Sequence, residues 1–251
     1  MRRCSRRRSS HRLNSACNAT LIIDTLKDTF REARAALAES LALAQVLGDM
    51  NRELTALNNL GLVALVQENV AEAEVLFTEV HTRATAVGNR KQAAEGLVNL
   101  SMVADLRQDH KAARSNLQQA LALAREMGAQ HSIALGLVNL AYVDIKLGQL
   151  AAARAGLREG LALALRLGAL PYIMVGAVSN FAELALAEGQ TEWALALCGL
   201  ARRQPAWSND DQRLMDETLA RWALDPSVVE AGLANGAELD WDTTIQELLK
   251  G

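Results

Sequence analysis

A period of 40 residues is the feature that most constrains the fold of this chain. Gly48, Gly88, Gly128 and Gly168 are separated by 40 residues each, and each follows a stretch rich in alanine and leucine. Glycine directly after a helix adopts a left-handed conformation without the steric penalty of a Cβ atom, so each of these glycines predicts a helix end. A fixed period of this length indicates a repeat protein that stacks similar units.

A second marker keeps the same period and divides each repeat into two helices. Asn59-Leu60, Asn99-Leu100 and Asn139-Leu140 are in phase, and Asn180-Phe181 follows after a slip of one residue. Short polar breaks separate helices of about 17 residues, or about 25 Å. The predicted first helices are 53–67, 91–107, 131–147 and 172–188, and the predicted second helices are 70–87, 110–127, 150–167 and 191–203.

The N-terminal part is predicted to hold a degenerate copy of the repeat. Residues 29–47 have the pattern of a second helix, and a worn first helix is expected around 14–27. Residues 1–13 are rich in arginine and cannot bury a core, so we expect a disordered, solvated tail. An arm for nucleic acid or a membrane surface, or a transit peptide, is the alternative.

Beyond residue 203 the repeat pattern fails, and residues 204–251 predict a small helical cap. Ser208 can cap a helix that extends to Trp222, Asp225-Pro226 can start a second one that ends near Gly232 or Gly236, and Asp240 or Asp242 precedes the last. The apolar residues of this segment are expected to close the exposed end of the stack. They are Leu214, Leu219, Trp222, Val228, Leu239, Trp241 and Leu248.

Composition supports helices and restricts the partners. Half of the residues are hydrophobic, with an excess of alanine and leucine, while only 4% are aromatic and three are proline. The net charge is -3, but residues 1–23 carry six arginines and no acid, so the repeats are acidic. An acidic body argues against nucleic-acid binding along the repeats.

The cysteines and the hydropathy indicate a cytoplasmic location. The three cysteines are odd in number and lack metal-ligand spacing, as expected for reduced thiols. No apolar run approaches the roughly 18 residues of a membrane span, so we expect no contact with a membrane.

The order of small and large residues in each repeat resembles the tetratricopeptide pattern. The first full copy reads Leu57, Leu60, Gly61, Ala64, Ala73, Phe77 and Val80, and later copies keep this phase. The resemblance implies an all-α, right-handed solenoid of antiparallel helix pairs over residues 14–203, with a degenerate pair and four repeats. The period of 40 instead of 34 is similar to that of longer variants in kinesin light chain, spindle-orientation adaptors and bacterial signalling regulators. A HEAT or armadillo array shares the period and is the structural alternative.

The C-terminal segment looks like the end of large bacterial regulatory ATPases. The resemblance lies in LARRQPAW and in a G-x-x-L-D-W-D-x-x-I-x-x-L-L pattern. In those proteins an NTPase module precedes the repeats, but this sequence has no G-x-x-x-x-G-K-[ST] phosphate loop. The resemblance implies a regulatory arm without its NTPase domain.

The four asparagines of the period are the predicted partner-binding residues. Asn59, Asn99, Asn139 and Asn180 take equivalent places on first helices, which line the inner surface of a tetratricopeptide superhelix. A side-chain amide both donates and accepts, so it can pair with the backbone of an extended peptide. Alternatively, each amide satisfies a neighbouring helix or faces water. The predicted groove also includes Asn58, Leu62, Met102, Tyr142 and Glu183.

This groove lacks the basic residues of a clamp for acidic chain ends, so we expect a protein or peptide ligand with hydrophobic anchors. Catalysis has little support, because His11, His81, His110 and His131 are scattered and no G-x-S-x-G elbow occurs. We therefore predict a non-enzymatic interaction module without a cofactor. A homodimer through the degenerate N-terminal pair is a further hypothesis.

Overall fold

The computed structural model describes residues 30–168 and 170–250, which contain helices and no β-strand. The predicted all-α class is therefore confirmed. The tail 1–13 and the predicted helix 14–27 lie outside the described residues. The chain divides into two compact units, Met1–Val87 and Gly88–Gly251, and each is described by itself.

The first unit shows why small residues recur in the repeat. It contains a helix over residues 30–47, α2 (Met50–Val66) and α3 (Val70–Ala86). Helices α2 and α3 pack together, and a Cβ atom added at Gly61 would lie only 2.4 Å from Cε1 of the buried Phe77. Glycine at position 61 therefore gives the Phe77 ring its space. A salt bridge between Arg83 and the buried Glu53 also joins the two helices.

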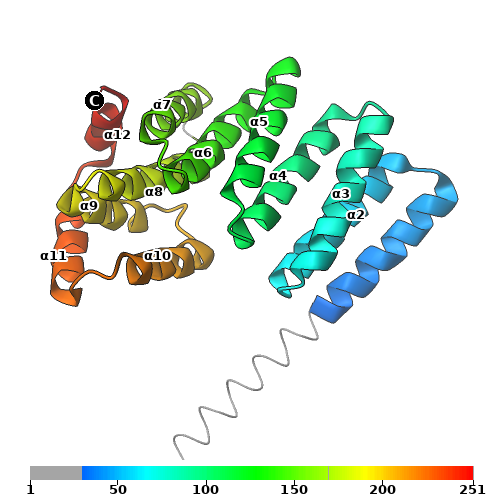
Figure 1. Cartoon of the computed structure of the whole chain (residues 1–251), viewed down its shortest axis with the longest axis horizontal. Helices are drawn as coiled ribbons and strands as arrows, with labels where there is room; N and C mark the ends of the chain where they lie inside the picture. Colours follow the sequence, from blue (N-terminus) through cyan, green and yellow to red (C-terminus); the bar gives the residue numbers. More distant parts are fainter. Residues whose placement is uncertain (1–29, 169, 251) are drawn as a thin grey trace, which may run out of the picture. The chain divides into compact units, whose positions relative to one another are not determined.

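The second unit continues with three helix pairs. They are α4 (Arg90–Leu106) with α5 (His110–Glu126), α6 (Gln130–Lys146) with α7 (Leu150–Arg166), and α8 (Pro171–Ala187) with α9 (Thr191–Arg202). Each helix contacts the next along the chain from α4 to α9, and α6 also contacts α8 (Figure 1). These contacts are those of a tetratricopeptide-like solenoid. The predicted bounds are correct to within three residues.

The turns follow the predicted chemistry. Gly48, Gly88, Gly128 and Gly168 all have positive φ angles, between 64° and 93°. The turns after the first helices use the same conformation, although Glu68 and Gln108 adopt it at φ 59° and 60° without being glycine. Several helices then begin at a side chain that accepts a hydrogen bond from the first turn. These capping residues are Asp49, Asn69, Asn89 and Asp109.

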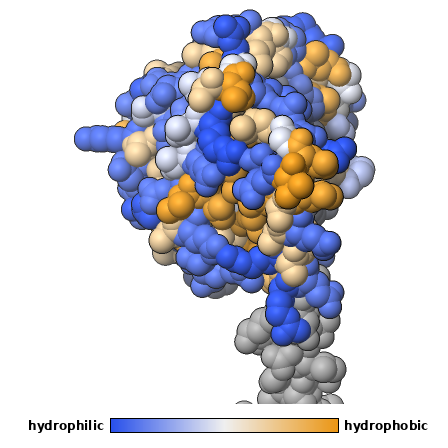
Figure 2. Space-filling view, turned by 90° about the vertical axis from the view of Figure 1, so that its right-hand side faces the viewer, coloured by the Kyte–Doolittle hydropathy of each residue, from blue (hydrophilic) through white to orange (hydrophobic). Residues whose placement is uncertain are grey.

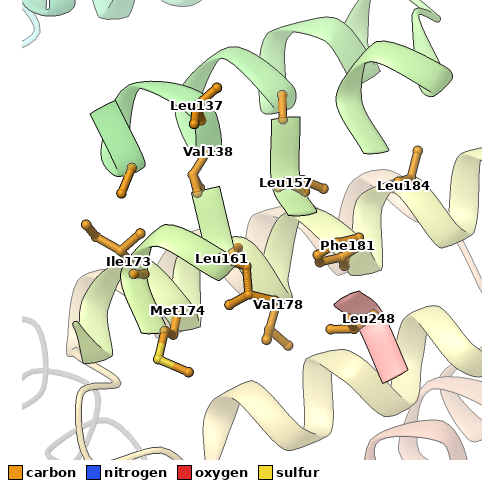
Figure 3. Close-up of a cluster of buried hydrophobic side chains, with 14 of the residues drawn as sticks. Leu137, Val138, Leu157, Leu161, Ile173, Met174, Val178, Phe181, Leu184 and Leu248 are labelled. Carbon is orange, nitrogen blue, oxygen red and sulfur yellow. The ribbon is translucent and has the colours of Figure 1, made fainter. Parts of the chain in front are cut away.

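A continuous core fills the space between α6, α7, α8 and α9. Leu157, Leu161 and Leu184 are almost completely buried, and Phe181 packs in the same cluster (Figure 3). Gly160 allows α7 to approach α6 closely, because a Cβ there would lie 3.1 Å from the carbonyl oxygen of Ala134. Burial of this apolar surface stabilises the helix pairs against one another.

Arginines at one repeat position link successive repeats. Arg34, Arg114 and Arg154 differ in number by multiples of 40, and each pairs with a carboxylate in the following repeat. The pair of Arg114 and Asp144 is the most buried, since the Asp144 side chain is only 5% exposed and its Oδ1 lies 2.6 Å from the Arg114 Nε.

The C-terminal segment forms α10 (Asn209–Trp222), α11 (Pro226–Ala237) and α12 (Trp241–Lys250). The predicted caps are confirmed: Ser208 and Asp211 form a capping box, Asp225 precedes Pro226, and the Asp240 Oδ1 accepts a hydrogen bond from the Thr243 backbone N–H. Helix α11 packs against α9, while α12 contacts α7.

The prediction that α11 ends near Gly232 or Gly236 is confirmed for Gly236, because the helix ends at Ala237. Both glycines lie inside α11, where they allow its backbone to approach α9. A Cβ at Gly236 would lie 2.1 Å from the Ala196 carbonyl oxygen, and a Cβ at Gly199 would lie 2.2 Å from that of Leu233. The two glycines therefore also allow close packing of α11 against α9.

Candidate functional site

A groove of about 480 Å³ lies in the second unit between the first helices of the repeats and α10. Most of its lining residues come from α4, α6 and α8 and from α10, which follows the last repeat. This volume lies within the range of pockets that hold drug-sized ligands. Most of the lining is apolar, and it includes four aromatic side chains: Tyr142, Tyr172, Trp207 and Trp222.

The groove brings together five of the nine residues predicted from sequence. Asn139, Asn180, Met102, Tyr142 and Glu183 all line it. Asn99 is on α4 but is not among the lining residues. Asn58, Asn59 and Leu62 lie on α2 in the first unit, where Leu62 is 36% exposed and both asparagines are half-buried.

The amides at the centre of the groove differ in their hydrogen bonds. The Asn180 Nδ2 donates to the Val138 carbonyl oxygen at 3.0 Å, so this amide joins α8 to α6. Asn139 is half-buried on α6, and its side chain has no hydrogen-bond partner among the described residues. Asn180 thus serves the neighbouring backbone with one of its N–H groups, while its Oδ1 and second N–H stay available.

Glu183 attaches α10 to the repeats. Its carboxylate is 2.7 Å from Nη2 of Arg221 on α10 and 3.4 Å from Nζ of Lys146 on α6. Thr218 of α10 also donates to it at 3.5 Å. The Glu183 side chain is 13% exposed, so both cations compensate a carboxylate that is largely removed from water.

Tyr142 provides a neutral hydroxyl and a ring face in the groove. Burial, with the charge of Asp105 nearby, raises the pKa of its phenol to about 12, so the hydroxyl keeps its proton at neutral pH. The Lys146 Nζ lies 4.9 Å from the centre of the Tyr142 ring, a cation–π contact.

Sequence reasoning missed the contribution of α10 and of the segment before it. Trp207, Leu214, Met215, Thr218 and Trp222 line the groove, although Leu214 and Trp222 were predicted to close the end of the stack. Met215, Thr218 and Trp222 follow a spacing of three and four residues, which places them on one face of a helix. That spacing indicates an amphipathic helix, but it does not indicate which surface the helix faces.

Cys198 lies beside the groove as a buried, free thiol. Burial raises its pKa from 9.0 to about 12. At pH 7.5 its thiolate population is thus smaller in the folded than in the unfolded chain by a factor of about 1,000.

We expect iodoacetamide to modify Cys198 at least about 100-fold more slowly in the folded protein than in urea. Mass spectrometry of proteolytic peptides would separate its modification from that of Cys4 and Cys17. Equal rates under the two conditions would contradict the burial of this thiol.

Residues 30–168 and 170–250 were also compared with the requirements of a metal site and of a membrane span. No three His, Cys, Asp or Glu side chains in these ranges are grouped so that they could hold a metal ion. None of the helices formed by these residues is both long and apolar enough for a transmembrane span.

Residues 52–126, which span α2 to α5, match a family model described as tetratricopeptide repeat. The match supports the prediction that this is a tetratricopeptide repeat protein. The match favours this class over a HEAT or armadillo array, in agreement with the residue pattern. No curated protein matches the chain. Tetratricopeptide repeats generally mediate protein–protein interactions, and their family typically acts as a scaffold without catalysis.

Proposed function

We propose that this tetratricopeptide repeat protein binds a peptide segment of a partner protein in the groove between α4, α6, α8 and α10. The observation that carries the proposal is the meeting of Asn139 and Asn180 on the wall of one apolar groove. Apolar side chains of a peptide fill such a groove, while the two amides pair with its backbone. The lining includes residues of the first helices α4, α6 and α8, on which the resemblance places a binding surface.

The amides are expected to contribute measurable affinity. Changing Asn139 and Asn180 together to alanine removes two to four hydrogen bonds, each worth about 0.5–1.5 kcal/mol, so we expect at least about tenfold weaker binding. Peptides would first be selected from a random display library with the full chain, then synthesised and measured by fluorescence anisotropy.

Asn116→Ala is the matched control, because Asn116 is on α5 and is not among the groove-lining residues. Unchanged affinity in the double variant, with correct folding shown by circular dichroism, would reject the role of the amides. Asn59 and Asn99 hold equivalent places on α2 and α4, and their part in the same ladder stays a prediction.

A homodimer is a second candidate, favoured by exposed apolar side chains in the first unit. Leu43, Val46 and Leu47 on the helix over residues 30–47 are 56%, 84% and 63% exposed. Figure 2 shows hydrophobic patches within a mostly hydrophilic face of the molecule. Light scattering over a range of concentrations tests this candidate, and a monomeric mass at high concentration would reject it.

The regulatory role that the C-terminal resemblance implies is a separate proposal. It is supported by two sequence patterns, LARRQPAW and the one around Trp241. The DNA upstream of Met1 tests it, because an open frame that encodes a phosphate loop would support the proposal and a stop codon would remove it.

A further inference from the structure

The carboxylates that line the groove differ in whether a lysine or arginine lies close enough to neutralise them. Asp105 on α4, Glu183 on α8 and Asp211 on α10 all line it, and the lining set contains no lysine or arginine. Glu183 is compensated by Lys146 and Arg221 from outside the lining set. Its charge is therefore not available to a ligand.

Asp105 and Asp211 have no such compensation by lysine or arginine among the described residues. Asp105 has a contact of 3.1 Å with the His110 Nδ1, and Asp211 accepts hydrogen bonds from Ser208 in the capping box of α10. Two carboxylates from different helices thus bring negative charge to the groove, in addition to the Glu183 carboxylate that Lys146 and Arg221 compensate. An acidic peptide or a phosphate group would be repelled there, while a cation would be attracted.

The aromatic rings favour the same class of ligand. Tyr142, Tyr172, Trp207 and Trp222 line the groove, and Tyr172 is 48% exposed. Rings of this kind attract a guanidinium or ammonium group over their faces. The chain itself provides an example, since the ammonium group of Lys146 lies over the Tyr142 ring.

Apolar side chains at the groove remain accessible to a ligand. Met102 on α4 is 46% exposed, and Leu214 on α10 is 59% exposed. The indole Nε1 of Trp222, another lining residue, is buried and has no acceptor among the described residues.

We propose that the ligand of this groove is a basic amphipathic peptide, with one arginine or lysine flanked by apolar residues. The cation lies between the aromatic rings and is attracted by Asp105 and Asp211, while the flanking side chains contact Met102 and Leu214. This inference rests on the proposed function and adds the charge of the partner to it.

The test uses the full chain and pairs of synthetic peptides. Each peptide selected from the random library is made in two further forms, with its basic residue changed to glutamate or to glutamine. We expect the glutamate form to bind at least tenfold more weakly than the basic form. The difference should shrink as the salt concentration rises, because salt screens exposed charges.

Protein variants assign the effect to the groove. Asp105→Asn and Asp211→Asn, alone and combined, should weaken binding of the basic form severalfold and leave the glutamine form unchanged. Asp216→Asn is the matched control, since Asp216 is an exposed carboxylate on α10 that does not line the groove. An equal loss with this control would overturn the inference.

The outcomes separate the two proposals. Selection of acidic or neutral peptides that lose affinity in the Asn139→Ala and Asn180→Ala variant would overturn the basic ligand and leave the peptide-binding function standing. Basic peptides that bind the Asp105→Asn and Asp211→Asn variants as tightly as the unchanged protein would also overturn the inference. A library that yields no binding peptide would reject both proposals.

Discussion

Replacing Arg114 with methionine is expected to lower the free energy of unfolding by about 3–5 kcal/mol. The change leaves Asp144, whose side chain is 5% exposed, without its cationic partner. A buried carboxylate without a partner loses its hydration and gains nothing in return. For a chain of this size the melting temperature should fall by about 10 °C.

Two variants sharpen this test. Arg125 lies on α5 like Arg114, and Arg125→Met removes its salt bridge with Glu159 of α7. Both side chains of that pair are more than half exposed, so the change should cost less than about 1 kcal/mol. The double change Arg114→Met and Asp144→Ala should recover most of the lost stability, because Ala64 and Ala104 occupy the equivalent places in the earlier repeats. Urea unfolding followed by circular dichroism at 222 nm measures all three, and equal midpoints for the two single variants would contradict the prediction.

The change Gly236→Ala is expected to separate α11 from α9. The added Cβ would lie 2.1 Å from the Ala196 carbonyl oxygen and 2.8 Å from the Gly199 Cα, so two backbones must move apart. Because neither atom belongs to a flexible side chain, the cost should reach about 3 kcal/mol or more, at the upper end of overpacked cores.

Tryptophan emission reports on this region, since all four tryptophans lie in α9, α10, α12 or the segment before α10. Gly156→Ala is the control: its Cβ would meet its nearest heavy atom at 3.5 Å, an ordinary contact, and alanine favours the helix. A Gly236→Ala protein with the emission and unfolding midpoint of the control would show that the two helices do not depend on this contact.

The repeat part of the fold could be predicted from sequence because each of its signals is local. The left-handed glycine at each helix end, the spacing of small residues and the polar turns all act within one repeat. The helix bounds differ from prediction by three residues or fewer, as for α2, which begins at Met50 instead of residue 53. Such shifts depend on which Asp or Asn becomes the capping residue.

The C-terminal part could be predicted only as separate helices. The capping box at Ser208 and the proline at position 226 are local, and both are confirmed. What α10 and α11 pack against depends on contacts far along the chain. Gly236 illustrates the limit, because the sequence predicts the helix end near it but not its close approach to Ala196 of α9.

The candidate site shows the same division. Asn139 and Asn180 could be predicted as neighbours because the repeat places them on adjacent first helices. The residues of α10 could not, since nothing in their spacing identifies the face they oppose. The hydrogen bond of Asn180 to Val138 also requires the distance between α6 and α8, which the period does not give.

The position of α10 determines how the chain can be shortened without loss of the groove. A fragment that stops at Arg203, after the last repeat, would keep every repeat residue and yet lose one wall, two indole rings and one of the two uncompensated carboxylates. Transfer of the repeats alone into another protein would therefore leave out the side of the groove that α10 forms. A fragment that keeps all lining residues of the groove must extend to Trp222.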